Sequence, residues 1–176
     1  MTKRTQKVAG DLKEYLSDVN TRLPRRLPLK EMAILVHDAH VRDGGASIHP
    51  RFGNLKRQAL IAVSLYPERT LRINGSEIPF ELIAVFYKQN ADLFQDPRLI
   101  LGTWYNADQD ITYLDVTAVF PRWQEAVSLA ATYNQIAVYD LALETEVSIG
   151  GTGDEPSDMP PEIQRLPPLM RMQEEE

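Results

Sequence analysis

Apolar positions recur at helical spacing near the start of the chain. The first stripe comprises Val8, Leu12, Leu16, Val19 and Leu23. These residues lie three or four apart, which predicts a helix that ends before the proline at position 24. A linker over 24–28 follows, and a second stripe runs from position 29 to 40 before two glycines at 44 and 45. The pattern therefore predicts two N-terminal helices.

After residue 45 the pattern changes to short apolar runs, which are typical of strands. The predicted strands are 46–49, 59–66, 99–105, 111–119 and 136–143, with 70–73 and 147–149 as optional additions. Two further helices are predicted, one between 76 and 96 and one from 121 to about 134. The expected fold is α+β, with a mostly antiparallel sheet of about five strands covered by two helices. A parallel crossover through the last helix would make the sheet mixed.

Composition divides the chain into a folded part and a tail. Residues 1–153 are expected to form a single α+β domain, with a helical part over 1–45 and a sheet-containing core over 46–153. Residues 154–176 hold five of the twelve prolines and carry two cations against seven acids. Such a segment is predicted to be a disordered acidic tail. An inert tail is the favoured interpretation of this segment. The alternative is a short linear motif that folds on a partner, formed by Leu166, Leu169, Met170 and Met172.

The chain has no cysteine, which excludes disulfides, thiolate metal sites and a cysteine nucleophile. No apolar run approaches the ~20 residues that a membrane-spanning helix needs. The N-terminus has no apolar segment of the kind that signal peptides contain. We therefore expect a cytoplasmic protein without a membrane partner, and no cofactor is predicted.

Charge is distributed unevenly along the sequence. Residues 1–57 carry twelve Lys and Arg against six Asp and Glu, whereas residues 58–176 carry seven against nineteen. The basic third would present a positive face to an anion, or it would dock on the acidic remainder of the same chain. The overall pI near 5.1 argues against a dedicated non-specific nucleic-acid binder.

The densest polar cluster lies between positions 47 and 57. His49 is the candidate general acid or base of a metal-independent nuclease, and Arg51, Lys56 or Arg57 would stabilise a phosphate. The same three cations would also hold a nucleotide or another anion without catalysis. A solvated basic turn is the plainer interpretation of this cluster.

Two other groups have both a chemical and a structural interpretation. Trp104 and Tyr105 would stack on a nucleobase, or would serve as core and rim of a strand. His37 and His40 are three residues apart on one helical face, so with His49 they are candidate zinc ligands. For both groups the structural interpretation is favoured.

Four segments in the middle of the chain form a distinctive pattern: 101–106 (LGTWYN), 113–117 (YLDVT), 134–141 (NQIAVYDL) and 150–153 (GGTG). This pattern resembles a family of uncharacterised proteins from actinobacteria and their phages. The chain departs from the pattern at Leu60 and Ile61, where a glycine and an aromatic residue are expected. The resemblance implies a phage or prophage product in a bacterial cell, but it carries no activity and no site residue.

The favoured function is a non-enzymatic phage or prophage accessory protein that binds a bacterial host protein or a defence-system factor. The absence of a catalytic motif and the uneven charge support it. The first alternative is a nucleotide- or anion-binding module that uses the basic turn at 49–57. The second is a small RNase-like enzyme that uses His49.

Overall fold

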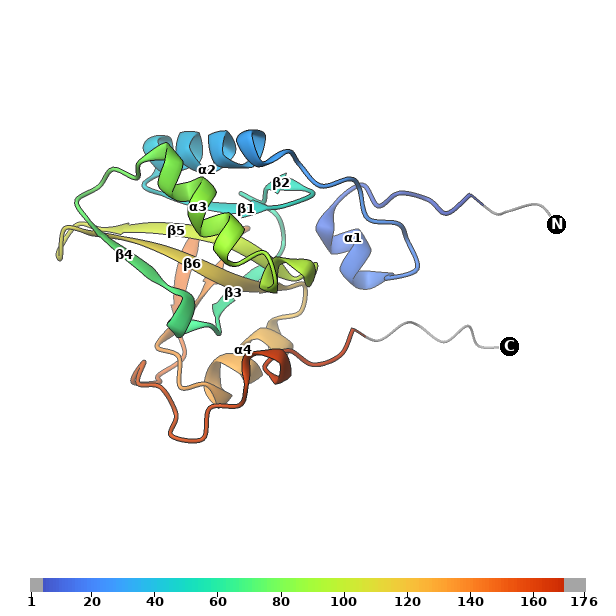
Figure 1. The fold of residues 1–176 in the computed structure, drawn as a ribbon. Coiled ribbons are helices and arrows are strands. Elements are labelled where there is room, and N and C mark those ends of the chain that lie inside the picture. The colour runs from blue at the N-terminus through green and yellow to red at the C-terminus, as the bar shows by residue number, and fades with distance from the viewer. Residues whose placement is uncertain (1–4, 170–176) are drawn as a thin grey trace.

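The computed structural model describes residues 5–169, in which four α-helices pack around one antiparallel sheet (Figure 1). The helices are α1 (Leu12–Ser17), α2 (Leu29–Asp43), α3 (Phe80–Gln89) and α4 (Trp123–Thr132). The strands are β1 (Gly45–His49), β2 (Gly53–Asn54), β3 (Ile61–Ser64), β4 (Leu71–Asn74), β5 (Leu99–Asn106), β6 (Ile111–Phe120), β7 (Ala137–Asp140) and β8 (Thr145–Ser148). The predicted α+β class and the antiparallel character of the sheet are confirmed.

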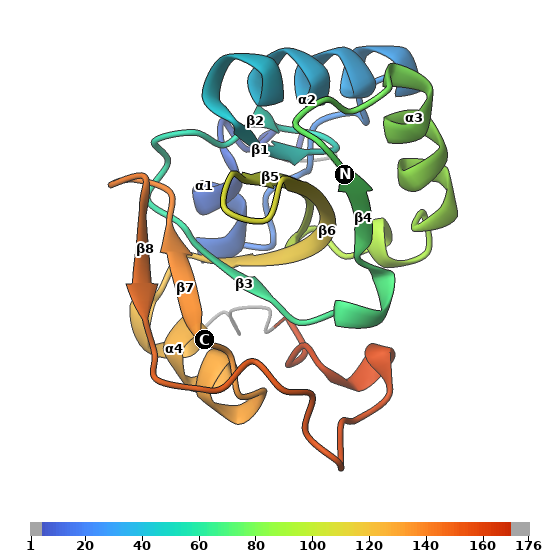
Figure 2. The same cartoon turned by 90° about the vertical axis from the view of Figure 1, so that its left-hand side faces the viewer.

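The number of strands was predicted wrongly, because the sheet has eight strands and not about five. Its order is β2-β1-β5-β6-β3-β7-β8, with β4 also paired to β6, and it curves into a half-barrel (Figure 2). Strands β4 and β8 overlap the optional strands at 70–73 and 147–149, whereas β2 was not predicted, because its two residues are too few to give a period. Every pairing within the sheet is antiparallel, so the mixed alternative is also wrong.

Strand β6 is the centre of the sheet. It pairs with β5 along its length, while its other edge pairs first with β4 and then with β3. A 3₁₀ turn, η1 (Pro67–Arg69), connects β3 to β4 beside this edge. Asp115 lies between the two pairings, where it accepts a hydrogen bond from the Thr70 hydroxyl, and burial raises the pKa of its carboxyl group. The partner of this strand aspartate is thus a threonine.

The two faces of the sheet bury different clusters. Alternate residues of β5 and β6, including Leu101 and Val116, join the main core with buried residues of α2, α3 and α4. On the opposite face, Ile100 and Val119 pack with Leu12 of α1. Toward the β5–β6 hairpin, the same face carries the stacked rings of Trp104 and Tyr113.

The first helix is much shorter than its apolar stripe predicts. Asp11 caps its N-terminus by accepting from the Glu14 amide at 2.7 Å, and the Glu14 carboxylate accepts from the Gly10 amide at 2.6 Å. At the other end, the Asp18 carboxylate accepts from the Asn20 amide at 3.0 Å and turns the chain. These local side-chain bonds fix both ends of the helix and override the wider periodicity.

The glycine-rich segment at 150–153 has a structural role. Its backbone lies against the turn after α4, where Asn134 adopts a φ of +54° and its side chain accepts from the Thr152 amide at 3.0 Å. A Cβ atom on Gly151 would lie 2.3 Å from the Gln135 carbonyl oxygen, so only glycine fits without a shift. Two segments of the family resemblance are therefore neighbours in the fold.

The C-terminal part, for which composition predicts a disordered tail, contacts the domain. Residues 154–169 follow the domain surface, and Arg165 is only 5% exposed. Arginine side chains make most of these contacts, and apolar burial contributes less. Of the predicted linear motif, Leu166 packs on the main core, while Met170 and Met172 lie outside the described residues.

Candidate functional site

His49 ends β1 and is almost completely buried, with 1% of its surface exposed. Its Nε2 atom lies 2.8 Å from the Pro97 carbonyl oxygen, and its Nδ1 atom accepts from the amides of Arg51 at 2.9 Å and Phe52 at 3.2 Å. A carbonyl can only accept, so Nε2 carries the proton and the ring is neutral. Burial lowers the pKa of His49 to about 4. Both ring nitrogens are therefore engaged by the backbone, and the side chain stabilises the β1–β2 turn.

That turn presents Arg51 next to the linker that precedes α2. The Leu27 amide donates to the Pro50 carbonyl at 2.8 Å, and Arg51 Nη1 donates to the Pro24 carbonyl at 2.7 Å. The same linker carries Arg26, whose guanidinium donates to the Tyr87 hydroxyl at 3.2 Å and the Phe94 carbonyl at 2.9 Å. Two half-buried guanidinium groups are thus fixed on hydrogen-bonded segments.

Neither guanidinium has a carboxylate partner within 4.0 Å among residues 5–169. Burial and then the positive charge of Arg26 lower the pKa of Arg51, which shows that the two cations repel each other. Each guanidinium also has more N–H donors than these contacts use. Such a pair is suited to bind an anion that approaches from solvent.

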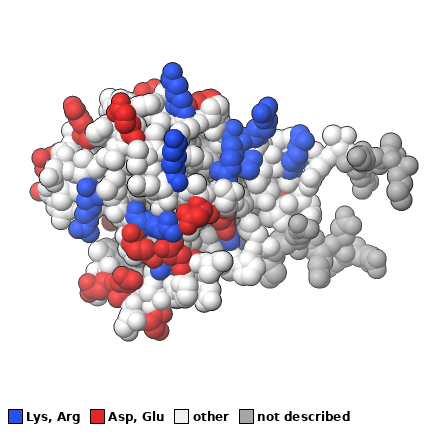
Figure 3. Space-filling model, viewed as in Figure 1, with Lys and Arg blue, Asp and Glu red and all other residues white. Residues whose placement is uncertain are grey.

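Exposed cations extend this pair into a larger surface, which we call the basic face and define by its five residues. They are Arg22, Arg25, Arg26, Lys30 and Arg51. Lys and Arg side chains gather over the linker and the start of α2 (Figure 3). The first turn of α2 also carries one acidic residue, Glu31. None of the five forms an ion pair with another residue of the described chain.

Lys56 and Arg57 have different surroundings from Arg51, although the sequence groups the three. Lys56 Nζ lies 3.1 Å from an Asp43 oxygen and 3.4 Å from a Glu144 oxygen. Arg57 Nε lies 4.0 Å from the other Glu144 oxygen. Arg42 and then Lys56 lower the pKa of Asp43 by hydrogen bonding. Lys56 therefore joins the end of α2 to the β7–β8 turn, whereas Arg57 is exposed and has one distant carboxylate neighbour.

Trp104 and Tyr105 point to opposite faces of β5, because they are adjacent in a strand. The Trp104 ring, which is 53% exposed, stacks on Tyr113 at a centroid distance of 5.6 Å and an angle of 19°. The guanidinium of Arg72 lies 5.6 Å from the Tyr113 centroid on the same face. Tyr105 instead donates to Asp110 at 2.9 Å. The two predicted stacking residues do not form one platform.

His37 and His40 do not converge on a metal site. His40 is buried between the Thr103 hydroxyl, 2.8 Å from Nδ1, and the Ser76 carbonyl, 3.0 Å from Nε2, and burial lowers its pKa. His37 is partly exposed and its ring lies edge-on to Phe80. Both line an open hollow of about 910 Å³ next to Tyr105. In the part of the chain that the structure describes, no three His, Cys, Asp or Glu side chains could hold a metal ion.

Arg26, which completes the pair with Arg51, was not among the residues predicted from the sequence. Two adjacent arginines between prolines, at positions 24–28, were the available signal. Because the linker is extended, its backbone groups make no helical hydrogen bonds and can contact Pro50 and Arg51. A pattern search could not place this linker next to a turn about 25 residues away.

Comparisons with protein-family models, curated proteins and solved structures find no match to this chain. The resemblance of its middle segments to actinobacterial and phage proteins therefore stays a prediction. Within residues 5–169, no helix combines the length and the apolar character needed to cross a membrane.

Proposed function

We propose that the protein is a non-enzymatic binding protein whose basic face contacts an acidic segment of a partner protein. The observation that carries this proposal is the Arg26–Arg51 pair, which is fixed by backbone contacts and has no carboxylate partner in the described chain. Desolvated arginines with free donors favour bidentate contacts with carboxylates. The partner we propose is a bacterial host protein or a defence-system factor, in keeping with the resemblance to phage proteins.

The surroundings of the other candidate residues support binding over the two alternatives. A nuclease that used His49 would need a free ring nitrogen, and both nitrogens of His49 already have backbone partners. A nucleotide site on the basic turn would need Lys56 and Arg57, and both face Glu144. No observation favours either alternative over the basic face.

The test uses a fluorescein-labelled oligoglutamate peptide and fluorescence anisotropy at several salt concentrations. The full chain is compared with the double variant Arg26→Gln/Arg51→Gln. The matched control, Lys56→Gln/Arg57→Gln, removes the same charge from the Asp43–Glu144 cluster. We expect the first variant to lose about tenfold or more in affinity and the control to change by less than about twofold.

Three results would contradict the proposal. Equal losses in the two double variants would mean that only net charge matters. If the wild-type chain did not bind oligoglutamate, an acidic segment would be excluded as the partner. Binding of pyrophosphate without peptide binding would instead assign the pair to a small anion.

A further inference from the structure

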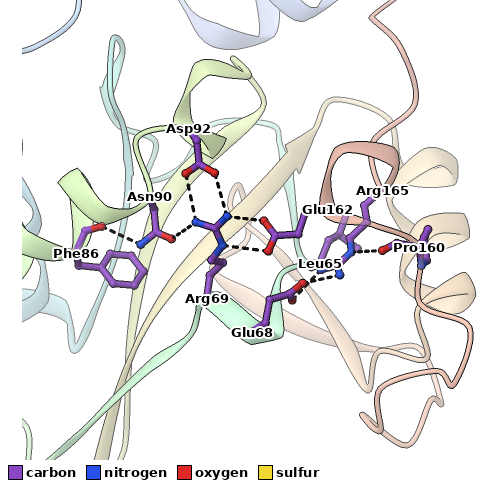
Figure 4. Close-up of polar contacts among 9 residues, drawn as sticks. All are labelled: Leu65, Glu68, Arg69, Phe86, Asn90, Asp92, Pro160, Glu162 and Arg165. Carbon is purple, nitrogen blue, oxygen red and sulfur yellow. Dashed lines mark hydrogen bonds and ion pairs between the residues drawn. The ribbon is translucent and has the colours of Figure 1, made fainter.

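The C-terminal strap, which we define as residues 159–169, places Arg165 in a socket formed by the domain (Figure 4). The Arg165 guanidinium lies over the Tyr66 ring, 5.5 Å from its centroid. Its Nη1 atom donates at 2.8 Å to both the Leu65 carbonyl and the Glu68 carboxylate. An aromatic face, a carbonyl and a carboxylate therefore recognise this one side chain.

Glu162 is the second charged anchor of the strap. Its two carboxylate oxygens accept from Arg69 Nε at 3.1 Å and Nη2 at 2.7 Å. Arg69 is already oriented by the domain, because Asp92 accepts at 3.2 and 2.9 Å and the Asn90 side chain accepts at 3.2 Å. The domain thus offers a positioned cation to an incoming carboxylate (Figure 4).

The spacing of the two anchors follows from the local backbone. Residues Glu162–Gln164 form a 3₁₀ turn, η3, and side chains three residues apart point to the same side of such a turn. Glu162 and Arg165 therefore lie on the same side of the strap, Glu162 opposite Arg69 and Arg165 opposite Glu68. We call the domain surface that they contact, which also includes Tyr66, the groove. The groove thus holds an acidic residue and an arginine three positions after it.

Prolines flank this pair on both sides, at 160–161 and 167–168. Pro161 has φ −52° and ψ +147°, which is polyproline II geometry, and Arg98 donates to the Pro167 carbonyl. The apolar contacts are modest: Met159 and Leu166 are partly buried, while Ile163 is 89% exposed. A proline-rich segment loses little conformational entropy on docking. The strap thus has the properties of a bound peptide.

We propose that this groove is a recognition site for partner segments that carry Glu-x-x-Arg between prolines, and that the strap occupies it in cis. A hollow of about 570 Å³ beside the strap, lined by Leu93, Arg98 and Leu99, leaves room for larger flanking side chains. The site shares no residue with the basic face and does not depend on its function. Because the tethered strap competes at a high effective concentration, a free segment of equal contacts binds the wild-type chain weakly.

The experiment follows a labelled peptide of residues 157–169 by fluorescence anisotropy against full-length chains. The strap variant Glu162→Ala/Arg165→Ala frees the groove, and the control Asp158→Ala/Gln164→Ala changes side chains outside these contacts. We expect the strap variant to bind the peptide about tenfold tighter than the wild type and the control do. A peptide with alanine at positions 162 and 165 should bind about tenfold more weakly than the unaltered peptide.

Equal affinity of the strap variant and the wild type would overturn the proposal, as would equal binding of the alanine peptide. A second measurement applies if the strap variant does not fold. The wild-type chain is titrated with excess unlabelled peptide, and the strap amides are followed by NMR. Displacement moves them to the positions of a free peptide, whereas unmoved strap signals at saturating peptide would reject the groove as a recognition site.

Discussion

The arginines of the strap region and those of the basic face have opposite surroundings. Arg69, Arg98 and Arg165 each contact a carboxylate of the domain or the strap. Arg26 and Arg51 contact only carbonyls and a tyrosine hydroxyl within the described residues. The hydrogen bonds from Arg69 to Glu162 and Asp92 raise the pKa of Arg69, whereas burial lowers the pKa of Arg51. The same residue type thus stabilises one region and leaves the other available for a ligand.

The largest expected effect concerns His49, which stabilises the turn that carries Arg51 of the basic face. His49→Ala should lower the free energy of unfolding by about 4 kcal/mol, because it leaves a cavity and removes three hydrogen bonds to buried backbone. Urea denaturation measures this change. The variant His49→Asn keeps an acceptor for the turn amides and should lose about half as much. A fully stable His49→Ala chain would show that the turn carrying Arg51 does not depend on this ring.

The two regions should also respond to acid over different pH ranges. The pKa of His49 is about 4 in the fold, below its ordinary value of 6.5, so the unfolded chain binds the proton first. Stability should therefore fall by about 1.4 kcal/mol per pH unit as the pH decreases from 6.5 to about 4. Buried His40, whose pKa is also lowered, adds to the fall in the same direction.

The strap should lose its contacts only at lower pH. Burial of Glu68 opposes its ionisation, but the hydrogen bond from Arg165 outweighs burial and lowers the pKa of the Glu68 carboxyl group. The hydrogen bond from Arg69 lowers the pKa of Asp92 in the same way. Lowered carboxylate pKa values stabilise the fold above the ordinary values and lose that effect as the pH falls through the folded values. NMR of the strap amides between pH 7 and 3 separates the two ranges. If the strap contacts were lost near pH 6, together with the stability that depends on His49, this order would be contradicted.

A smaller effect is expected from the strap itself. Arg165→Ala should lower the free energy of unfolding by about 2 kcal/mol, because Glu68 and the Leu65 carbonyl lose a charged donor. Arg165→Lys should retain part of this energy, since a lysine keeps the charge but not the planar fork. The neighbouring Ile163→Ala serves as the control, with a change below about 0.5 kcal/mol at an exposed position. A change at Ile163 as large as that at Arg165 would mean that the strap packs differently.

The sequence predicted the elements that have a long apolar period, and it missed contacts between distant segments. Helix α2 and strands β5 and β6 follow from the periodicity over 29–40, 99–105 and 111–119. The strap does not, because its ordering depends on Arg69 and Glu68, which lie more than 90 residues away from their partners. Arg51 was named from composition, yet its neighbour Arg26 and the acidic partners of Lys56 depend on the fold alone.

The last prediction has the smallest expected change in stability and compares an arginine of the basic face, Arg51, with one of the strap region, Arg98. Arg51→Gln should alter the free energy of unfolding by less than about 0.5 kcal/mol, since glutamine can still donate to the Pro24 carbonyl and the repulsion from Arg26 disappears. The paired substitution Arg98→Gln should cost about 1–2 kcal/mol, because it removes the contacts with Asp96 and Pro167. Added sulfate should raise the melting temperature of the wild type more than that of Arg51→Gln, because under the proposed function an anion would bind the basic face of the folded chain only. If Arg51→Gln destabilised the chain as much as Arg98→Gln, Arg51 would be a structural arginine like those of the strap. The basic face would then lose the residue on which its proposed function depends.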